Sequence, residues 1–165
     1  MKKIIVSLLL LLPLGLMAQE LKIAIVKYNE LILSHPDFDN FENEMAKVRS
    51  QYEQQAKVMD DEFQKKYADF TSQADSLTEN IKIMRMQEIE NLRERIETFI
   101  PNAEAELSKT QEQLITPIYE KIQNAINSVG EENGYTYIVN PQAFHYIGSN
   151  AVDVTNLVKA KLGIK

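Results

Sequence analysis

The sequence predicts an α+β fold that is mostly helical, in which a long antiparallel coiled-coil hairpin projects from a small body of β-strands. Apolar residues recur every three or four positions from residue 37 to residue 129, with polar residues between them, as on one face of a helix. This stretch contains no glycine. The segments on either side of it are rich in β-branched and aromatic residues, which favour strands.

Two apolar stripes predict the two helices of the hairpin. A helix of about 36 residues is about 54 Å long, which is longer than a domain of this size is wide. The helices therefore project, and they pair along loosely heptad stripes. A compact helical bundle is the alternative that periodicity alone leaves open. The first stripe is Phe38, Phe41, Met45, Val48, Tyr52, Ala56, Met59, Phe63, Tyr67, Phe70, Ala74 and Leu77, and the second is Ile89, Leu92, Ile96, Ile100, Ala103, Leu107, Leu114, Ile118, Ile122, Ala125 and Val129.

The tip of the hairpin is expected near residues 71–78. Thr71, Ser72, Asp75 and Ser76 cluster there, and the stretch holds no other local turn pattern. Ser76 or Thr78 can cap the returning helix.

Two prolines lie inside the returning helix. Pro101 and Pro117 each remove a backbone hydrogen bond, at a cost of about 3 kcal/mol unless the helix bends. The apolar spacing continues through both, so we expect curvature near Phe99 and Thr116, and hinge-like flexing, without an end to the helix.

The first 18 residues have the layout of a cleaved secretory signal peptide. Lys2 and Lys3 precede an apolar run of about 14 residues, too short for a span of about 20, and Ala18 suits the cleavage site. An uncleaved anchor is the alternative. We expect a periplasmic protein, exported across the inner membrane of a bacterium. Because the chain has no cysteine, lipid anchoring, disulfides and thiolate metal sites are excluded.

Loss of Lys2 and Lys3 changes the formal charge from -6 to -8. An acidic chain is not expected to bind nucleic acid or lipopolysaccharide through bulk charge, because such binding needs clustered Lys and Arg.

Residues 19–36 and 130–165 form the predicted body, and residues 37–129 form the arm. Leu21, Ile23 and Ile25 share one face of a first strand at 21–26. A short helix at 28–34 ends at His35-Pro36, and Asp37 caps the first arm helix. We expect two more strands, 135–139 and 143–147, as a hairpin around residues 140–142, and a last helix at 154–162 behind Asp153. A base of about 55 residues is marginal alone, so oligomerisation is expected.

No pattern in the sequence predicts catalysis, and we expect neither enzyme activity nor a metal or cofactor. His35 and His145 are the only histidines, and they lack metal-ligand spacing, so both are expected to be structural or exposed. Serine elbows and glycine-rich phosphate loops are missing from the sequence. Residues 60–62 are acidic, but they lie on the predicted solvated face.

Apolar residues near the tip are the candidate binding surface. Leu77, Ile81 and Met84 are expected to pair across the hairpin, whereas Ile83 and Met86 point elsewhere on the same helix. Methionine is flexible and polarisable, which suits varied partners. The candidates, some of which also fit the seam between the helices, are Phe63, Tyr67, Phe70, Ile83, Met84 and Met86.

The order of short motifs resembles the Skp/OmpH family of periplasmic chaperones for outer-membrane proteins. The resemblance covers essentially the whole mature chain, because every motif occurs in the expected order around the long hairpin. The matching segments are Lys22-Ile-Ala-Ile-Val26, Phe41-Glu-Asn-Glu44, Pro117-Ile-Tyr-Glu-Lys-Ile122, Asn133-Gly-Tyr-Thr-Tyr-Ile-Val139 and Asp153-Val-Thr155.

The resemblance implies a homotrimer whose strands build a small body and whose three arms enclose a cavity. Unfolded outer-membrane β-barrel proteins are held there without ATP, with transient proximity to the membrane. A structural or adaptor coiled coil of the cell envelope is the alternative function. The residues assigned to the oligomerisation body are Ile23, Ile25, Tyr137, Val139, Phe144 and Tyr146.

The charge of the arms departs from the family pattern, in which the arms are basic. Residues 37–121 carry 11 Lys or Arg against 19 Asp or Glu. Lipopolysaccharide binding is therefore not expected, and apolar residues are expected to carry most of the binding to clients.

Overall fold

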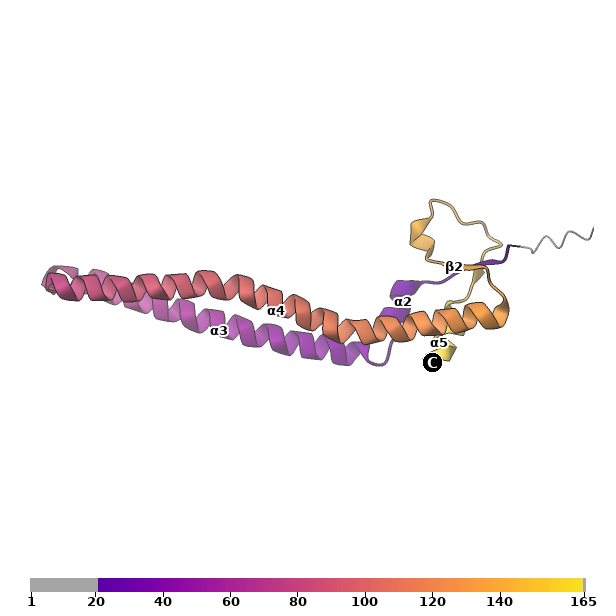
Figure 1. Ribbon diagram of the computed structural model, residues 1–165, viewed down its shortest axis with the longest axis horizontal. Helices are drawn as coiled ribbons and strands as arrows, with labels where there is room; N and C mark the ends of the chain where they lie inside the picture. The colour runs from indigo at the N-terminus through magenta and orange to yellow at the C-terminus, as the bar shows by residue number, and fades with distance from the viewer. Residues whose placement is uncertain (1–20, 165) are drawn as a thin grey trace, which may run out of the picture.

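The computed structural model describes residues 21–164, in which two long antiparallel helices extend from a small body (Figure 1). Helix α3 (Phe38–Gln73) leads to the tip, where a 3-10 turn (Ala74–Ser76) reverses the chain, and α4 (Glu79–Asn133) returns to the body. The predicted projecting hairpin is confirmed. The predicted signal peptide lies outside the described residues.

A narrow apolar seam holds the two arm helices together. None of the side chains of α3 is fully buried, and the residues of its predicted stripe are half-buried except for Tyr67, which is exposed. Opposite them, Leu92 and Ala103 of α4 are buried. The rings of Tyr52 and Phe99 lie across the seam with their centroids 6.1 Å apart. The hairpin therefore pairs α3 and α4 along the predicted stripe of α3.

Polar contacts near the tip tie the helices together beside the seam. Lys66 Nζ lies 3.1 Å from Glu88 Oε2, and Arg85 donates to Gln73 Oε1 at 3.0 Å. Both contacts are exposed, so each contributes little to stability on its own.

Three residues of α4 predicted for the seam lie outside it, and Ile81, at 41% exposed, is one of them. Ile100 is 42% exposed, and Phe99 takes the position against Tyr52. Met84 is 64% exposed, whereas its neighbour Arg85 is half-buried and in register with Ile89. A step of one residue turns a side chain by about 100° around a helix, so a small error in the register moves a residue from the seam to the surface.

Helix α4 continues through both prolines, as predicted (Figure 1). Pro101 and Pro117 are exposed, so the backbone groups that they leave unpaired lie on the solvent side of the helix. Figure 1 shows α4 curving in its middle part while it stays paired with α3.

The body contains a three-stranded parallel sheet in the order β2-β1-β3. The central strand β1 (Ile23–Ile25) pairs with β2 (Tyr137–Val139) and with β3 (Val152–Asp153). The sheet joins the two ends of the described chain, because β1 precedes the hairpin and β2 and β3 follow it.

The predicted strand at 143–147 is wrong. Residues 141–143 form a 3-10 turn instead, where Asn140 Oδ1 accepts a hydrogen bond from the Gln142 N–H at 3.1 Å. β2 and β3 both run parallel to β1 on its opposite sides, so the chain between them needs a long return connection in place of a tight hairpin. Residues 140–151 provide that connection, and the third strand lies later in the chain.

The core lies between the inner face of the sheet and the root of α4. Ala24 and Val26 pack there against Leu31 of α2 (Tyr28–Leu33) and Val158 of α5 (Thr155–Lys161). The root of α4 is thus part of the body and fixes the direction of the arm. It supplies Ile118, Ile122, Ala125, Ile126 and Val129 to the core.

The ends of the helices use fewer side-chain caps than the sequence predicts. Asp37 and Thr78 hold the N-cap positions of α3 and α4, but neither side chain makes a cap hydrogen bond. Asp153 accepts a hydrogen bond from the Thr155 N–H at 2.9 Å at the start of α5. Gly134 closes α4 with φ of 63°, in the left-handed region that favours glycine.

Candidate binding surfaces of the body and arm

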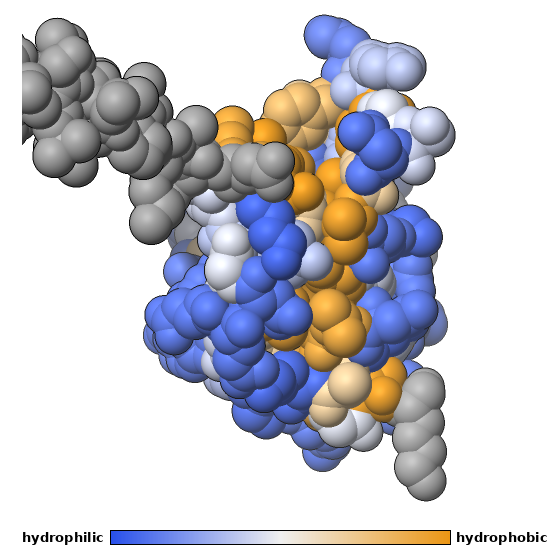
Figure 2. All heavy atoms as spheres, turned by 90° about the vertical axis from the view of Figure 1, so that its right-hand side faces the viewer, coloured by the Kyte–Doolittle hydropathy of each residue, from blue (hydrophilic) through white to orange (hydrophobic). Residues whose placement is uncertain are grey.

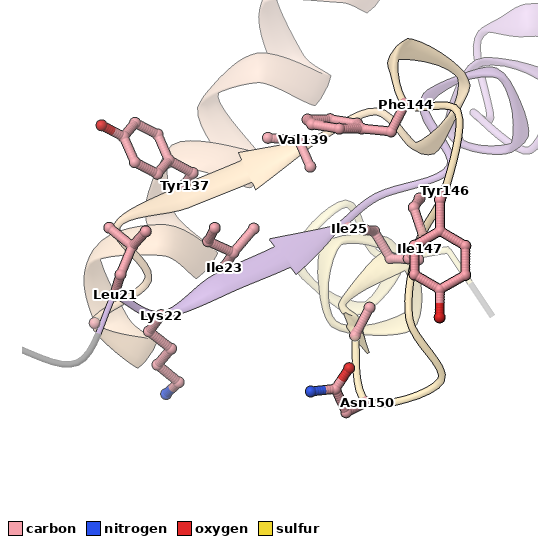
Figure 3. Close-up of a pocket in the computed structure, with 12 residues that line it drawn as sticks. Leu21, Lys22, Ile23, Ile25, Tyr137, Val139, Phe144, Tyr146, Ile147 and Asn150 are labelled. Atoms are coloured by element: carbon pink, nitrogen blue, oxygen red, sulfur yellow. The ribbon is translucent and has the colours of Figure 1, made fainter.

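The outward face of the sheet, the side turned away from α4, carries large apolar side chains (Figure 3). Alternation along β1 places Ala24 and Val26 in the core and leaves Ile23 and Ile25 on the other side. Tyr137 and Val139 of β2 continue this face. Both faces of the sheet carry apolar side chains, but only the inner face is covered by helices of the body. A single chain therefore leaves the outward apolar face uncovered.

The outward face borders a hollow of about 900 Å³. The connection from 140 to 151 forms its other side, and Tyr146 of this connection is 84% exposed. Figure 2 shows a band of hydrophobic surface between polar flanks on this end of the molecule. The structure brings together all the residues predicted for the oligomerisation body, namely Ile23, Ile25, Tyr137, Val139, Phe144 and Tyr146. Leu21, predicted to share a face with Ile23 and Ile25, also lines the hollow, as does Ile147, although neither was predicted for the oligomerisation body.

Lys22 is the one charged residue among those lining the hollow. Its Nζ donates to the Asn133 carbonyl oxygen at 2.6 Å and lies 4.4 Å from the centre of the Tyr135 ring. The cation is thereby held against the end of α4. The rest of the lining is apolar or uncharged, which suits a protein surface better than a small charged ligand.

The predicted binding residues of the arm fall into two groups. Phe63 and Phe70 are half-buried and belong to the seam, and Tyr67 stacks on Phe63 with ring centroids 6.1 Å apart. In contrast, Ile83, Met84 and Met86 are exposed on α4. The second group is therefore the accessible apolar surface near the tip.

Sequence reasoning missed one exposed apolar side chain of the arm, Val58, which lies on α3 outside the apolar stripe. Ile81 of α4 was predicted to pair across the hairpin but is exposed instead. The sequence could have predicted that Val58 is exposed. It lies between stripe residues on the polar face of the helix, where an apolar side chain has no packing partner.

Ion pairs hold α5 and the strands to the rest of the body. Lys159 Nζ lies 2.7 Å from Glu30 Oε1, and this hydrogen bond lowers the pKa of Glu30. Lys27 Nζ lies 3.2 Å from Asp153 Oδ2. Burial opposes ionisation of Asp153, but hydrogen bonds from Thr155 and Lys27 outweigh it and lower the pKa of Asp153.

The two histidines and the acidic side chains are scattered over the described residues. From residue 21 to residue 164, no three His, Asp or Glu side chains gather in an arrangement that could hold a metal ion. His35 is buried and His145 is exposed, on different parts of the body. Over the same residues, every helix is too short or too polar to cross a membrane.

Comparisons with known proteins agree with this architecture. The family model for outer membrane protein (OmpH-like) matches residues 22–162. A crystal structure of a candidate outer membrane chaperone (OmpH-like) from Caulobacter crescentus CB15 superposes with a TM-score of 0.74 at 11% identity, covering 86% of this chain and 83% of that one. No curated protein matches the chain. The family match spans nearly all the described residues, and the chain therefore belongs to the OmpH-like family.

Proposed function

We propose that the mature chain is an ATP-independent periplasmic holdase. It assembles as a homotrimer and binds unfolded outer-membrane proteins in the cavity between its arms, which prevents their aggregation before insertion. The observation that carries the proposal is the apolar outward face of the body, which lies at the root of a projecting arm. Membership of the OmpH-like family supports the same reading.

The outward face supports self-association. Exposed aromatic and branched side chains gather there on a body of few residues, and such a patch is normally covered by a partner. Three copies related by a threefold axis would close the interface and leave no apolar face open. The arms, which leave the body together, would then surround a common space.

The arms support binding of unfolded β-barrel chains. Such clients expose apolar faces and unpaired strand edges, which aggregate unless they are screened. Exposed Ile83, Met84 and Met86 offer flexible apolar contacts on each arm. Many weak contacts in one cavity give a tight complex in which each contact still breaks easily, so release does not need a nucleotide.

The charge of the arms limits the choice of ligand. Acidic residues outnumber basic ones over residues 37–121, so lipopolysaccharide and other polyanions are not part of the proposal. Client recognition rests on the apolar side chains.

A light-scattering assay tests the proposal. An unfolded outer-membrane β-barrel protein is diluted from urea into buffer with the mature chain at micromolar concentration. We expect the mature chain to suppress aggregation when the trimer is in excess over the client. Unchanged aggregation at that ratio would refute the holdase function.

Arm variants identify the client surface. We expect Ile83→Ser combined with Met86→Ser to weaken client binding by about tenfold or more, since two exposed apolar contacts are lost from every arm. Asn80→Ser combined with Gln87→Ser, two exposed polar positions on the same part of α4, is the matched control. Both proteins should keep the parent mass in light scattering. Equal client affinity of the two variants would show that Ile83 and Met86 are not part of the binding surface.

A further inference from the structure

The connection between α2 and α3 is the joint at which the N-terminal part of the body passes into the arm. It comprises residues 34–37, between the end of α2 and the start of α3. The His35 side chain is 4% exposed in this joint, although the segment lies at the surface. Backbone bonds run from His35 N–H to the Ile32 oxygen and from Phe38 N–H to the His35 oxygen. The start of the first arm helix is therefore held by this short segment, in addition to the seam between α3 and α4.

One side-chain hydrogen bond closes the joint. His35 Nδ1 accepts from the Asp37 N–H at 3.1 Å, across Pro36. An imidazole nitrogen can accept a hydrogen bond only while it carries no proton, so this bond exists only with a neutral ring.

The same turn occurs elsewhere in the chain with an acceptor that does not titrate. Asn140 Oδ1 accepts from the Gln142 N–H across Pro141, also at 3.1 Å. In both turns, a side chain bonds to the backbone two residues later with proline between them. The geometry thus works with an amide oxygen, and the histidine at position 35 adds sensitivity to protons.

Charged groups from three elements face the ring. Asp37 Oδ2 lies 3.8 Å from Nδ1 and also 2.6 Å from Lys121 Nζ of α4. A hollow of about 490 Å³ beside the ring is lined by both Lys121 and Lys161 of α5. Lys161 pairs with Glu132 at 2.6 Å. Protonation would place a third cation next to two lysines, with the Asp37 carboxylate as the nearest anion.

We propose that His35 is a proton-controlled latch of the joint between body and arm. A proton from solvent added to Nδ1 removes the acceptor of the Asp37 N–H, and the imidazolium competes with Lys121 for the Asp37 carboxylate. Both ties between the joint and its surroundings weaken, and the first turn of α3 gains freedom relative to the body while the later turns stay paired with α4. The latch does not depend on any client.

The pH range in which the joint opens follows from the direction in which folding shifts the pKa of His35. Burial lowers the pKa of His35 below its ordinary value of 6.5. The Asp37 carboxylate opposes this effect but is weaker than burial, and Lys121 adds a smaller lowering effect. The unfolded chain therefore binds more protons than the folded joint in this range. The closed latch is fully stable above about pH 6.5, loses stability as the pH falls below that value, and opens as the pH falls through the lowered pKa.

Two measurements on the full mature chain test the latch. Because the chain has only two histidines, ¹⁵N-histidine labelling reports the ring of His35 directly, with exposed His145 as an internal reference. Hydrogen exchange, corrected for the chemical rate at each pH, reports opening at the Asp37 amide. Between pH 7.5 and 5, we expect protonation of His35 together with about tenfold more opening, equivalent to the loss of about one hydrogen bond.

His35→Asn is the matched control, because an amide oxygen in the same turn keeps the bond at every pH, as at Asn140. We expect its Asp37 amide to show no such pH dependence. In a second variant, Lys121→Met, removal of a facing cation should raise the pH at which the joint opens, an effect that a purely structural role would not produce. The latch is refuted if His35→Asn opens with acid like the parent, if the parent stays closed while its ring protonates, or if Lys121→Met leaves the midpoint unchanged.

Discussion

At the scale of single residues, a difference of one helical position decides whether an apolar side chain stabilises the arm or is available for binding. Leu92 is buried in the seam, whereas Ile100, which has the same type of spacing in the sequence, is exposed. The free energy of unfolding should therefore respond very differently to truncation at the two positions.

We expect Leu92→Ala to lower the free energy of unfolding by about 2 to 3 kcal/mol and Ile100→Ala by less than about 1 kcal/mol. Urea denaturation at one fixed protein concentration measures both, since unfolding of an oligomer depends on concentration. Equal losses would show that the register of the seam differs from the one described here.

The sequence predicts burial well where only one apolar residue fits each step of three or four along a stripe. The half-buried residues of α3 and the buried root of α4 follow the spacing of apolar residues directly. Phe99 and Ile100 are adjacent and both fit a step of three or four from Ile96, so periodicity alone cannot choose between them. The choice depends on the contact with Tyr52 of the other helix, which is a tertiary contact.

At the scale of elements, local chemistry predicts the helices more reliably than the strands. The length of α3 and α4 and the turn between them follow from spacing and from turn residues. Residues 143–147 have the composition of a strand, but Asn140 fixes a 3-10 turn over residues 141–143 and the sheet is parallel. Pairing direction is a property of the assembled body, so a composition typical of strands was not enough.

The prolines give α4 its shape at a cost in stability. Pro101→Ala restores the hydrogen bond to a helix that is already continuous, so we expect the free energy of unfolding to rise by about 1 to 3 kcal/mol. We also expect a straighter arm, measured as a larger maximum dimension in small-angle X-ray scattering. Ala105→Ser, at an exposed position one turn further along, is the control. If the helix keeps the same curvature without Pro101, the bend is caused by packing against α3 and not by the proline.

At the scale of the whole molecule, the candidate site on the body could be predicted more completely than that on the arm. All the predicted body residues meet around one hollow. Strand alternation places Ile23, Ile25, Tyr137 and Val139 on one face, whereas Phe144 and Tyr146 reach the hollow from the connection at 140–151 and not from the predicted strand. On the arm, Phe63 and Phe70 lie in the seam, and Met84 lies on the surface. The hollow is open on a single chain, and the proposed assembly is what closes it.

A charge on the outward face should separate assembly from folding. Ile23→Asp places a carboxylate among Ile25, Tyr137 and Val139, where burial by a second copy would cost several kcal/mol. We expect the trimer to dissociate. Far-ultraviolet circular dichroism should still show the helical hairpin, whose seam lies outside the outward face.

Sedimentation velocity of the mature chain tests the central claim most directly, because a single run gives both mass and shape. The proposal predicts one species with three times the chain mass and a frictional ratio well above that of a compact sphere, since three arms project from a shared body. A compact species with the mass of one chain would contradict both the assembly and the projecting arms.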